Sequence, residues 1–230
     1  MIGIIAALDG EVLDIKREME AEEVHEYAGM HFYKGLLYEK PVVVVKCGVG
    51  KVNAGICTQI LVDKFEIEAV INVGIAGGLA KGLCVGDLVI GKDAVQYDMD
   101  ATAFGHPVGE IPNMDITYFP ADQKLVDSAR NAASELGVIA LVGRILTADK
   151  GVGSTKLKEE LRANFDGACV EMEGAAIAQA AYINHIPYCV IRSISDNADD
   201  SAAETYENNF EQSMKNAAAM VLKMIKDYQD

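Results

Sequence analysis

The chain alternates between short apolar runs and longer stretches with helical spacing. Glycine, proline or acidic residues bound the apolar runs, and the stretches between them place apolar residues three or four positions apart. The expected strands cover residues 2–7, 31–37, 42–45, 69–73, 85–91, 138–146, 169–170 and 190–194, and the expected helices cover 12–19, 51–64, 121–136, 156–165, 175–181 and 202–228. This alternation predicts a single α/β domain over residues 1–230, with a mixed, mostly parallel central sheet flanked by helices.

Acidic residues stand where several of these strands end. Glu171 and Glu173 lie between a strand and a helix, and Asp196 follows Arg192 at the end of the next strand. Ligands of α/β folds bind at the carboxyl ends of strands, so we interpret these two strand ends as one site. Glu11 marks a third junction between a strand and a helix. Taken alone, it is explained by the preference of helix N-termini for negative charge.

A glycine turn follows one buried strand, and a glycine-rich strand end closes another. The first, CGVGK at 47–51, lacks the third glycine of a dinucleotide-binding motif and the Ser or Thr of a P-loop, so we expect neither motif. It can still bring the backbone close to a ligand. The second, GIAGG at 74–78, removes side chains where a ligand or a packed helix comes close. Residues 105–120 are rich in glycine and proline and predict an irregular excursion that faces a partner or forms a lid.

Charge and cysteine content exclude several classes of function. The net charge of −15 argues against binding to nucleic acid or to anionic membranes, because both need a basic surface. The five cysteines are odd in number and form no CxxC motif, so we expect buried, reduced thiols and no metal site. No signal peptide and no apolar run of membrane-spanning length is visible. These features predict a cytoplasmic protein.

Six motifs carry a resemblance that covers essentially the whole chain. They are IGIIAALDGEV (2–12), VGKV (49–52), GIAGGL (74–79), TAFG (102–105), VEME (170–173) and RSISD (192–196). In this order they resemble the 5′-methylthioadenosine/S-adenosylhomocysteine nucleosidases of the purine nucleoside phosphorylase superfamily. The resemblance implies a nucleoside phosphorylase-like fold, no cofactor and a role in methionine salvage. It also implies hydrolysis of the N-glycosidic bond of both nucleosides, which releases adenine and a 5-thioribose product.

The resemblance also implies a role for individual residues. Glu11 matches the general base that activates water, and Asp196 matches the acid that protonates the adenine. Glu173 matches the carboxylate that binds the ribose hydroxyls, Met172 the side chain packed on the ribose, and Arg192 an arginine near the water. The remaining substrate-binding positions are Leu8, Val49, Gly77, Val152, Ser195 and Tyr206, together with Phe104, which the family contributes across the interface of a homodimer.

The chemistry of N-glycosidic bond cleavage explains the need for these acidic residues without reference to the family. Cleavage of an N-glycosidic bond passes through an oxocarbenium-like sugar, so the leaving base needs a general acid and the water a general base. An aspartic acid that donates a proton at neutral pH needs a raised pKa, which we expect from burial and from the nearby carboxylates Glu11 and Glu173.

Three alternatives are compatible with the motifs. The first is hydrolysis of the two nucleosides named above. The second is a phosphorylase, or a nucleosidase for another adenosine derivative, although residues 7–11 supply an acid where phosphate would need basic groups. The third is a non-catalytic nucleoside-binding module. Two positions depart from the family pattern: Ile75 replaces a small or hydroxylated residue, and Gly151 falls where an aromatic side chain stacks on adenine.

Overall fold

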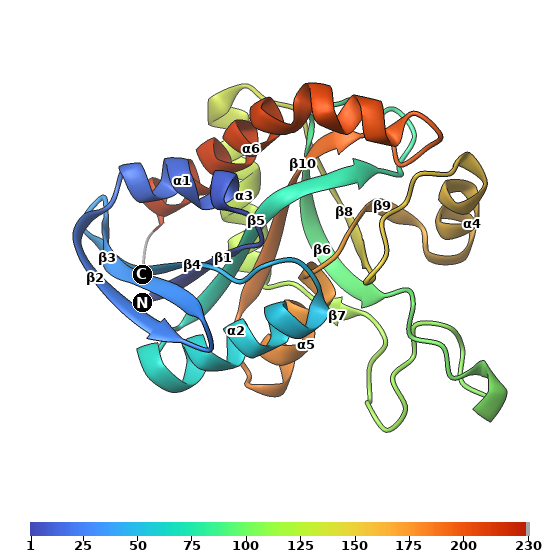
Figure 1. Cartoon of the computed structure of the whole chain (residues 1–230), viewed down its shortest axis with the longest axis horizontal. Coiled ribbons are helices and arrows are strands. Elements are labelled where there is room, and N and C mark those ends of the chain that lie inside the picture. Colours follow the sequence, from blue (N-terminus) through green and yellow to red (C-terminus); the bar gives the residue numbers. More distant parts are fainter. Residues whose placement is uncertain (229–230) are drawn as a thin grey trace.

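One continuous sheet forms the centre of the computed structural model, which describes residues 1–228 apart from the side chains of residues 21 and 22 (Figure 1). The strands in this range are β1 (Ile2–Ala6), β2 (Glu20–Tyr27), β3 (Met30–Leu37), β4 (Lys40–Lys46), β5 (Ala69–Gly78), β6 (Leu88–Gln96), β7 (Phe119–Pro120), β8 (Ala140–Thr147), β9 (Gly167–Glu171) and β10 (Tyr188–Asp196). The helices are α1 (Asp9–Arg17), α2 (Lys51–Phe65), α3 (Gln123–Leu136), α4 (Thr155–Phe165), α5 (Gly174–Ile183) and α6 (Ala202–Asp227), with a 3₁₀ turn at Thr102–Phe104.

The sheet closes on itself at one end and stays open at the other. Strands β10, β6, β8, β9 and β5 pair in sequence, and β10 also pairs with β5, so these strands form a closed ring. From β5 the sheet continues through β1 and β4 to the antiparallel pair β3 and β2 at the open edge. The pairs β4–β1, β1–β5 and β5–β10 are parallel, so the carboxyl ends of these strands lie at the same edge.

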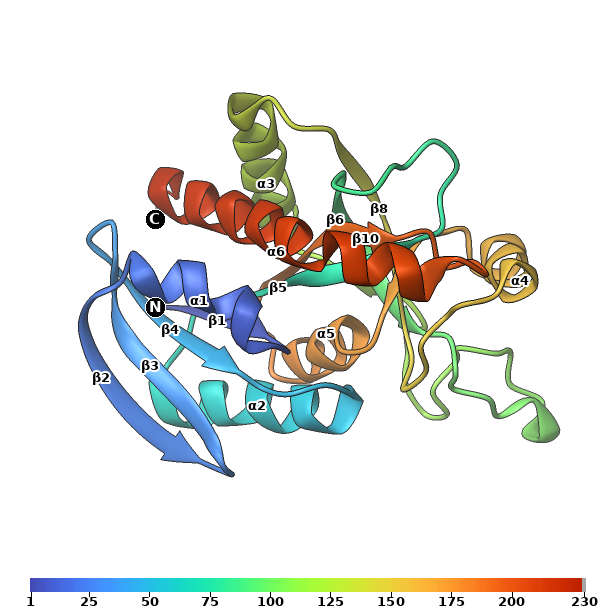
Figure 2. The same cartoon turned by 45° about the horizontal axis from the view of Figure 1, so that its top comes forward.

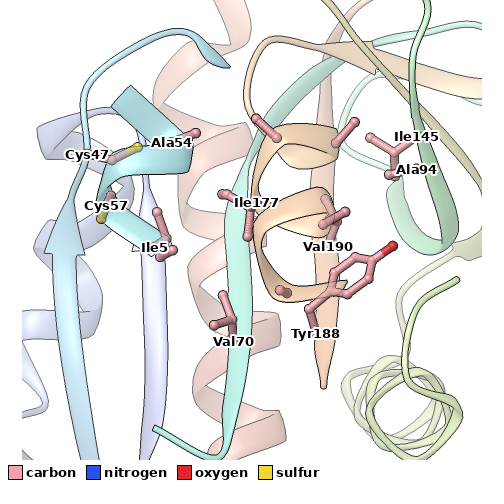
Figure 3. Close-up of a cluster of buried hydrophobic side chains, with 14 of the residues drawn as sticks. Ile5, Cys47, Ala54, Cys57, Val70, Ala94, Ile145, Ile177, Tyr188 and Val190 are labelled. Carbon is pink, nitrogen blue, oxygen red and sulfur yellow. The ribbon is translucent and has the colours of Figure 1, made fainter. Parts of the chain in front are cut away.

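Helices cover both faces of the sheet. α2 and α5 pack side by side on one face, and α1, α3 and α6 lie on the other (Figures 1 and 2). Each helix layer buries its own apolar cluster against the strands. Figure 3 shows the cluster under α2 and α5, where Cys57 and Ile177 of the two helices face Ile5, Val70 and Val190 of the sheet. Burial of this apolar surface is the main favourable term in folding.

The structure confirms the α/β class and the mixed sheet between helices, with two differences from the sequence-based expectation. β2 was not expected, because its sequence EAEEVHEY carries no apolar run; it is an edge strand that pairs on one side with β3. The strand expected at 69–73 extends to Gly78, so the glycine-rich segment is part of β5 and forms no turn. Ladder pairing with β10 and β9 keeps these glycines extended.

The cysteines follow the expected pattern with one exception. Cys47, Cys57, Cys169 and Cys189 are buried, unpaired thiols. Cys84 is also unpaired but exposed, because it lies in the loop before β6 and not in an apolar strand. In the described part of the chain, no helix is both long and apolar enough to cross a membrane.

The packing between β8 and the start of β9 can be tested at Gly143, with Gly55 of α2 as the control. A Cβ added at Gly143 would lie 2.4 Å from the Cβ of Ala168, whereas one added at Gly55 in α2 would meet no atom within 4 Å. We expect Gly143→Ala to lower the free energy of unfolding by about 1–3 kcal/mol through overpacking. Gly55→Ala should raise it by about 0.5–1 kcal/mol through helix propensity. Urea denaturation measures both, and an unchanged Gly143→Ala would contradict the tight contact.

Candidate active site

A cavity of about 390 Å³ opens at the edge where the carboxyl ends of the central strands meet. Its walls come from the segments after β1, β4 and β8, from the strand ends of β5, β9 and β10, and from the first turns of α6. The residues expected from the sequence that line it are Leu8, Glu11, Val49, Gly77, Val152, Met172, Glu173, Ser195, Asp196 and Tyr206. Residues far apart in the sequence therefore meet in one space.

Glu11 is both a helix cap and a cavity residue. Its Oε2 accepts the backbone N–H groups of Ala7 and Leu8, each at 2.9 Å, and its Oε1 accepts that of Ile75 at 3.2 Å. The contact with Leu8 caps the start of α1 as the N3 half of a capping box does, while the leucine side chain has no oxygen to supply the other half. Glu11 therefore caps a helix, as its sequence position alone suggested, and also lies in the cavity, as the resemblance implied. Burial raises the pKa of Glu11, against the opposing effects of Arg192 and the three N–H groups.

Arg192 and Glu171 form a buried ion pair behind the cavity. The Arg192 side chain is 1% exposed, and its Nη2 contacts the Glu171 carboxylate and donates to Asn72 Oδ1 at 2.7 Å. Glu173 Oε2 lies 3.7 Å from the same nitrogen. Gly74 makes room for the guanidinium, since a Cβ there would lie 2.2 Å from Arg192 Nη1. Arg192 thus lies beside the carboxylates, as the resemblance implied, but is not among the described residues that line the cavity.

Glu171 is the functional residue to which the sequence analysis gave no role. Besides its ion pair, it accepts the N–H groups of Glu173 and Gly174 at 3.0 and 2.7 Å and the hydroxyl of Thr147. It therefore holds the first residues of α5 and also lines the cavity. Its place at a strand end was visible in the sequence. The pairing with Arg192 was not, because it depends on how β9 and β10 sit in the sheet.

Glu173 lies against the N-terminus of α2. Its Oε1 accepts the backbone N–H of Gly50 at 2.8 Å. Burial, followed by the negative charge of Glu171, raises the pKa of Glu173 from 4.5 to about 7, although Arg192 and the Gly50 N–H oppose the shift. The carboxyl group can therefore change protonation near neutral pH.

Asp196 is the last residue of β10 and lines the cavity. Its Oδ1 accepts the N–H of Ala198 at 2.8 Å, and its Oδ2 accepts the hydroxyl of Ser195 at 2.9 Å. Burial raises the pKa of Asp196, with a smaller contribution from Asp199. The raised pKa agrees with the expectation for a proton donor. Burial is the largest cause, as expected, whereas the largest contribution from another carboxylate comes from Asp199 and not from Glu11 or Glu173.

Apolar side chains and one open stretch complete the walls. Val49 and Tyr206, 47% and 37% exposed, both line the cavity. Gly151 also lines it, and a Cβ at this position would meet no atom within 4 Å, so this wall has free space. Phe104 is 84% exposed and lies outside the described lining of its own chain's cavity. It sits on a segment that projects from the body of the molecule (Figures 1 and 2).

The arrangement is suited to proton transfer. Glu11 presents a carboxylate oriented by three N–H groups, and Asp196 has a pKa raised toward the range in which a carboxylic acid keeps its proton. A cavity that holds an oriented acceptor and an acid with raised pKa can supply a base and an acid to one substrate. In the part of the chain that the structure describes, no group of three or more His, Cys, Asp or Glu side chains is placed to hold a metal ion.

Comparisons with known proteins agree on one family. The model of the phosphorylase superfamily matches residues 1–226. A 5′-methylthioadenosine/S-adenosylhomocysteine nucleosidase from an Exiguobacterium species is 40% identical over 227 residues, which cover 98% of this chain and 97% of the relative.

Solved structures give the same result. The enzyme of that name from Neisseria meningitidis, in complex with methylthio-immucillin-A, superposes with a TM-score of 0.96 at 35% identity, and the match covers 99% of both chains. Futalosine hydrolase of Helicobacter pylori superposes with a TM-score of 0.95 at 32% identity, covering 99% of this chain and 97% of the other. The chain therefore belongs to the phosphorylase superfamily and, within it, to the 5′-methylthioadenosine/S-adenosylhomocysteine nucleosidases, which are N-glycosyl hydrolases.

Proposed function

We propose that this protein hydrolyses the N-glycosidic bonds of 5′-methylthioadenosine and S-adenosylhomocysteine. The observation that carries the proposal is the meeting of Glu11, Glu173 and Asp196 in one cavity whose nearest arginine is already paired. Arg192 Nη2 is bound by Glu171 and Asn72, and the described residues that line the cavity bring the carboxyl groups of Glu11, Glu171, Glu173 and Asp196 against a single lysine, Lys150. This excess of acids disfavours a phosphate dianion. Water is therefore favoured as the nucleophile over phosphate.

Each carboxyl group takes a separate role in the proposed reaction. Glu11 accepts a proton from the water that attacks the anomeric carbon, and its three N–H contacts keep the carboxylate oriented. Asp196 gives a proton to the leaving adenine, and its buried position keeps that proton available. Glu173 binds the ribose hydroxyls, and its negative charge stabilises the sugar as it becomes cationic. Met172 packs against the ribose.

The apolar wall accounts for the 5′ substituent. Val49 and Tyr206 offer apolar surface to a thioalkyl group, while Gly77, Val152 and Ser195 face the base end, with Leu8 beside Glu11. The Neisseria relative was crystallised with a methylthio compound, which fits this assignment. A second candidate is hydrolysis of another purine nucleoside such as futalosine. It is favoured by the Helicobacter neighbour and by the free space at Gly151.

The proposed substrates indicate a pathway for the enzyme, and its cysteines indicate a cellular compartment. Removal of methylthioadenosine and release of adenine place the enzyme in methionine salvage. The four buried, unpaired cysteines suit the reducing cytoplasm. No cofactor enters the proposed reaction, because proton transfer by carboxyl groups is sufficient for it.

A homodimer completes the proposed site. Phe104 is exposed, and α2 and α5 also expose apolar side chains: Val52 is 71%, Ile56 45% and Ile183 58% exposed. A groove between these two helices continues from Val52 to Ile183. A two-fold dimer would cover this surface and bring Phe104 to the partner's cavity.

The reaction class is tested by the products. Incubated with methylthioadenosine, the protein should release adenine and free methylthioribose, at a rate that added phosphate leaves unchanged. Each buried methylene-sized group of the 5′ substituent contributes about 0.8 kcal/mol, so methylthioadenosine should exceed adenosine in kcat/KM. Chromatography separates the products, with futalosine tested in parallel. A sugar 1-phosphate would assign a phosphorylase, and no cleavage of any adenosine derivative would favour a binding module.

Single substitutions test the roles of the acids. Glu11→Gln and Asp196→Asn should each lower kcat roughly 10²-fold or more, because each removes one proton-transfer partner. Glu173→Gln should lower kcat and raise KM, since its contact with the sugar strengthens in the transition state. Asp14→Asn serves as the control, because Asp14 is a partly exposed acid on the same helix as Glu11 that pairs with Arg17 outside the cavity. Near-normal turnover of Glu11→Gln would show that another group is the base.

Complementation between inactive chains tests the dimer. A Phe104→Ala chain keeps Glu11, and a Glu11→Gln chain keeps Phe104. If Phe104 acts across the interface, a mixed dimer has one intact site, so mixing the two variants should restore activity beyond that of either alone. Sedimentation equilibrium of the same samples measures the mass. A fully active monomer, or mixing without any gain, would contradict the shared site.

A further inference from the structure

The backbone of Gly50 reaches into the site and contacts Glu173. Gly50 is the N-cap of α2 with a φ of 101°, and its N–H donates to Glu173 Oε1 at 2.8 Å. A Cβ on Gly50 would lie 3.1 Å from Asp149 Oδ1, so both the conformation and the space require glycine. The first N–H groups of a helix have no partner within the helix, which leaves this donor free for a carboxylate. The glycine turn noted in the sequence therefore approaches a side chain of its own protein.

The next residue is held by a closed ring of contacts. The Lys51 N–H donates to Asp149 Oδ1 at 2.8 Å, and the Asp149 N–H donates to Asp98 Oδ2 at 3.1 Å. The Lys51 ammonium closes the ring on Asp98 Oδ1 at 2.6 Å. We call Lys51, Asp98 and Asp149 the loop clasp. The side chains of Lys51 and Asp98 are 17% and 29% exposed, so the clasp is partly shielded from solvent.

The loop clasp joins three segments that follow three different strands. Lys51 follows β4, Asp98 follows β6 and Asp149 follows β8. The segment after β4 contributes Val49 to the cavity, and the segment after β8 contributes residues 150–153. The segment after β6 leads on to Phe104. None of the three clasp residues is among the described residues that line the cavity, so within one chain they act on the cavity through what they hold. Lys51 and Asp149 also line the groove between α2 and α5, so sedimentation of each variant shows whether the oligomeric state has changed.

We propose that Lys51, Asp98 and Asp149 are positioning residues that hold the Gly50 N–H on Glu173 and thereby fix the carboxylate that binds the ribose. This inference rests on the proposed function for the role of Glu173, but the positioning itself does not depend on any substrate. A single ion pair that is still partly open to solvent, as this one is, contributes modestly to global stability. The consequence of losing the clasp should therefore appear in the site, and only weakly in the free energy of unfolding.

The protonation of Glu173 reports the Gly50 contact. The charged groups with the largest effects on the pKa of Glu173 are Glu171, Arg192 and Glu11, and the buried thiol of Cys47 also faces it. The Gly50 N–H lowers the pKa of Glu173, whose value of about 7 is otherwise set by burial and Glu171. If the clasp loosens and this N–H withdraws, the pKa rises further. Since the ionised carboxylate is the form that stabilises the sugar, the acid limb of the rate profile then moves to higher pH.

The test compares Lys51→Met with Lys223→Met, a lysine of similar exposure that pairs with Glu135 and Asp227 at the far end of α6. In Lys51→Met, kcat/KM for methylthioadenosine should fall roughly fivefold, the value expected for loss of about 1 kcal/mol. Lys223→Met should keep the wild-type value. Lys51→Arg should retain most of the activity, because it keeps the positive charge. The double variant Lys51→Met/Asp98→Asn should lose no more activity than either single variant, because each substitution breaks the same ring of contacts.

The second measurement needs no turnover. Carboxyl ¹³C NMR, with Glu173→Gln to assign the signal, should show the Glu173 titration moving up by about half a pH unit in Lys51→Met and in Asp98→Asn. The same shift in a protein without nucleosidase activity would support the clasp and remove the proposed function. An unchanged titration, with kcat/KM within about twofold of wild type in both folded variants, would overturn the clasp. Asp98→Asn keeps the test decisive if Lys51→Met does not fold.

Discussion

The buried ion pair between Arg192 and Glu171 is the interaction on which the site depends. Taking both charges out of water is costly, and further hydrogen bonds help to offset that cost. Asn72 of β5 accepts from the guanidinium, and the N–H groups at the start of α5 bind the carboxylate. The pair therefore links β5 and β10 with the end of β9 and fixes the start of a helix. Gly74 allows this because it carries no side chain where the guanidinium lies.

The same pair sets the chemistry of the remaining acids. Arg192 is already bound to Glu171, so it only partly offsets the burial of Glu11 and Glu173, and the pKa of each stays raised. Asp196 lies apart from this charge, and burial raises its pKa as well. A site built in this way holds three carboxyl groups with raised pKa values, and that of Glu173 is about 7. The proposed hydrolysis by water follows from this distribution of charge and from no single residue.

The sequence allowed the alternation of strands and helices, the acids at the strand ends and the family to be predicted. Those features depend on local patterns and on motifs. The closure of β5, β9, β8, β6 and β10 into a ring, and the contact of Gly50 with Glu173, 123 residues away, depend on tertiary packing and leave no local signal. β2 was missed because an edge strand needs few apolar residues. The role of Phe104 stays a prediction, since it concerns a second chain.

In the proposed reaction, Glu11 and Asp196 act on the two sides of one glycosidic bond. A crystal structure with an analogue of methylthioadenosine that resists hydrolysis is the most direct test. We expect the base beside Asp196, the ribose hydroxyls on Glu173, the thioalkyl group against Val49 and Tyr206, and a water between Glu11 and the anomeric carbon. A nucleoside bound in the reverse direction, with its base at Glu11, would contradict the assignment of acid and base.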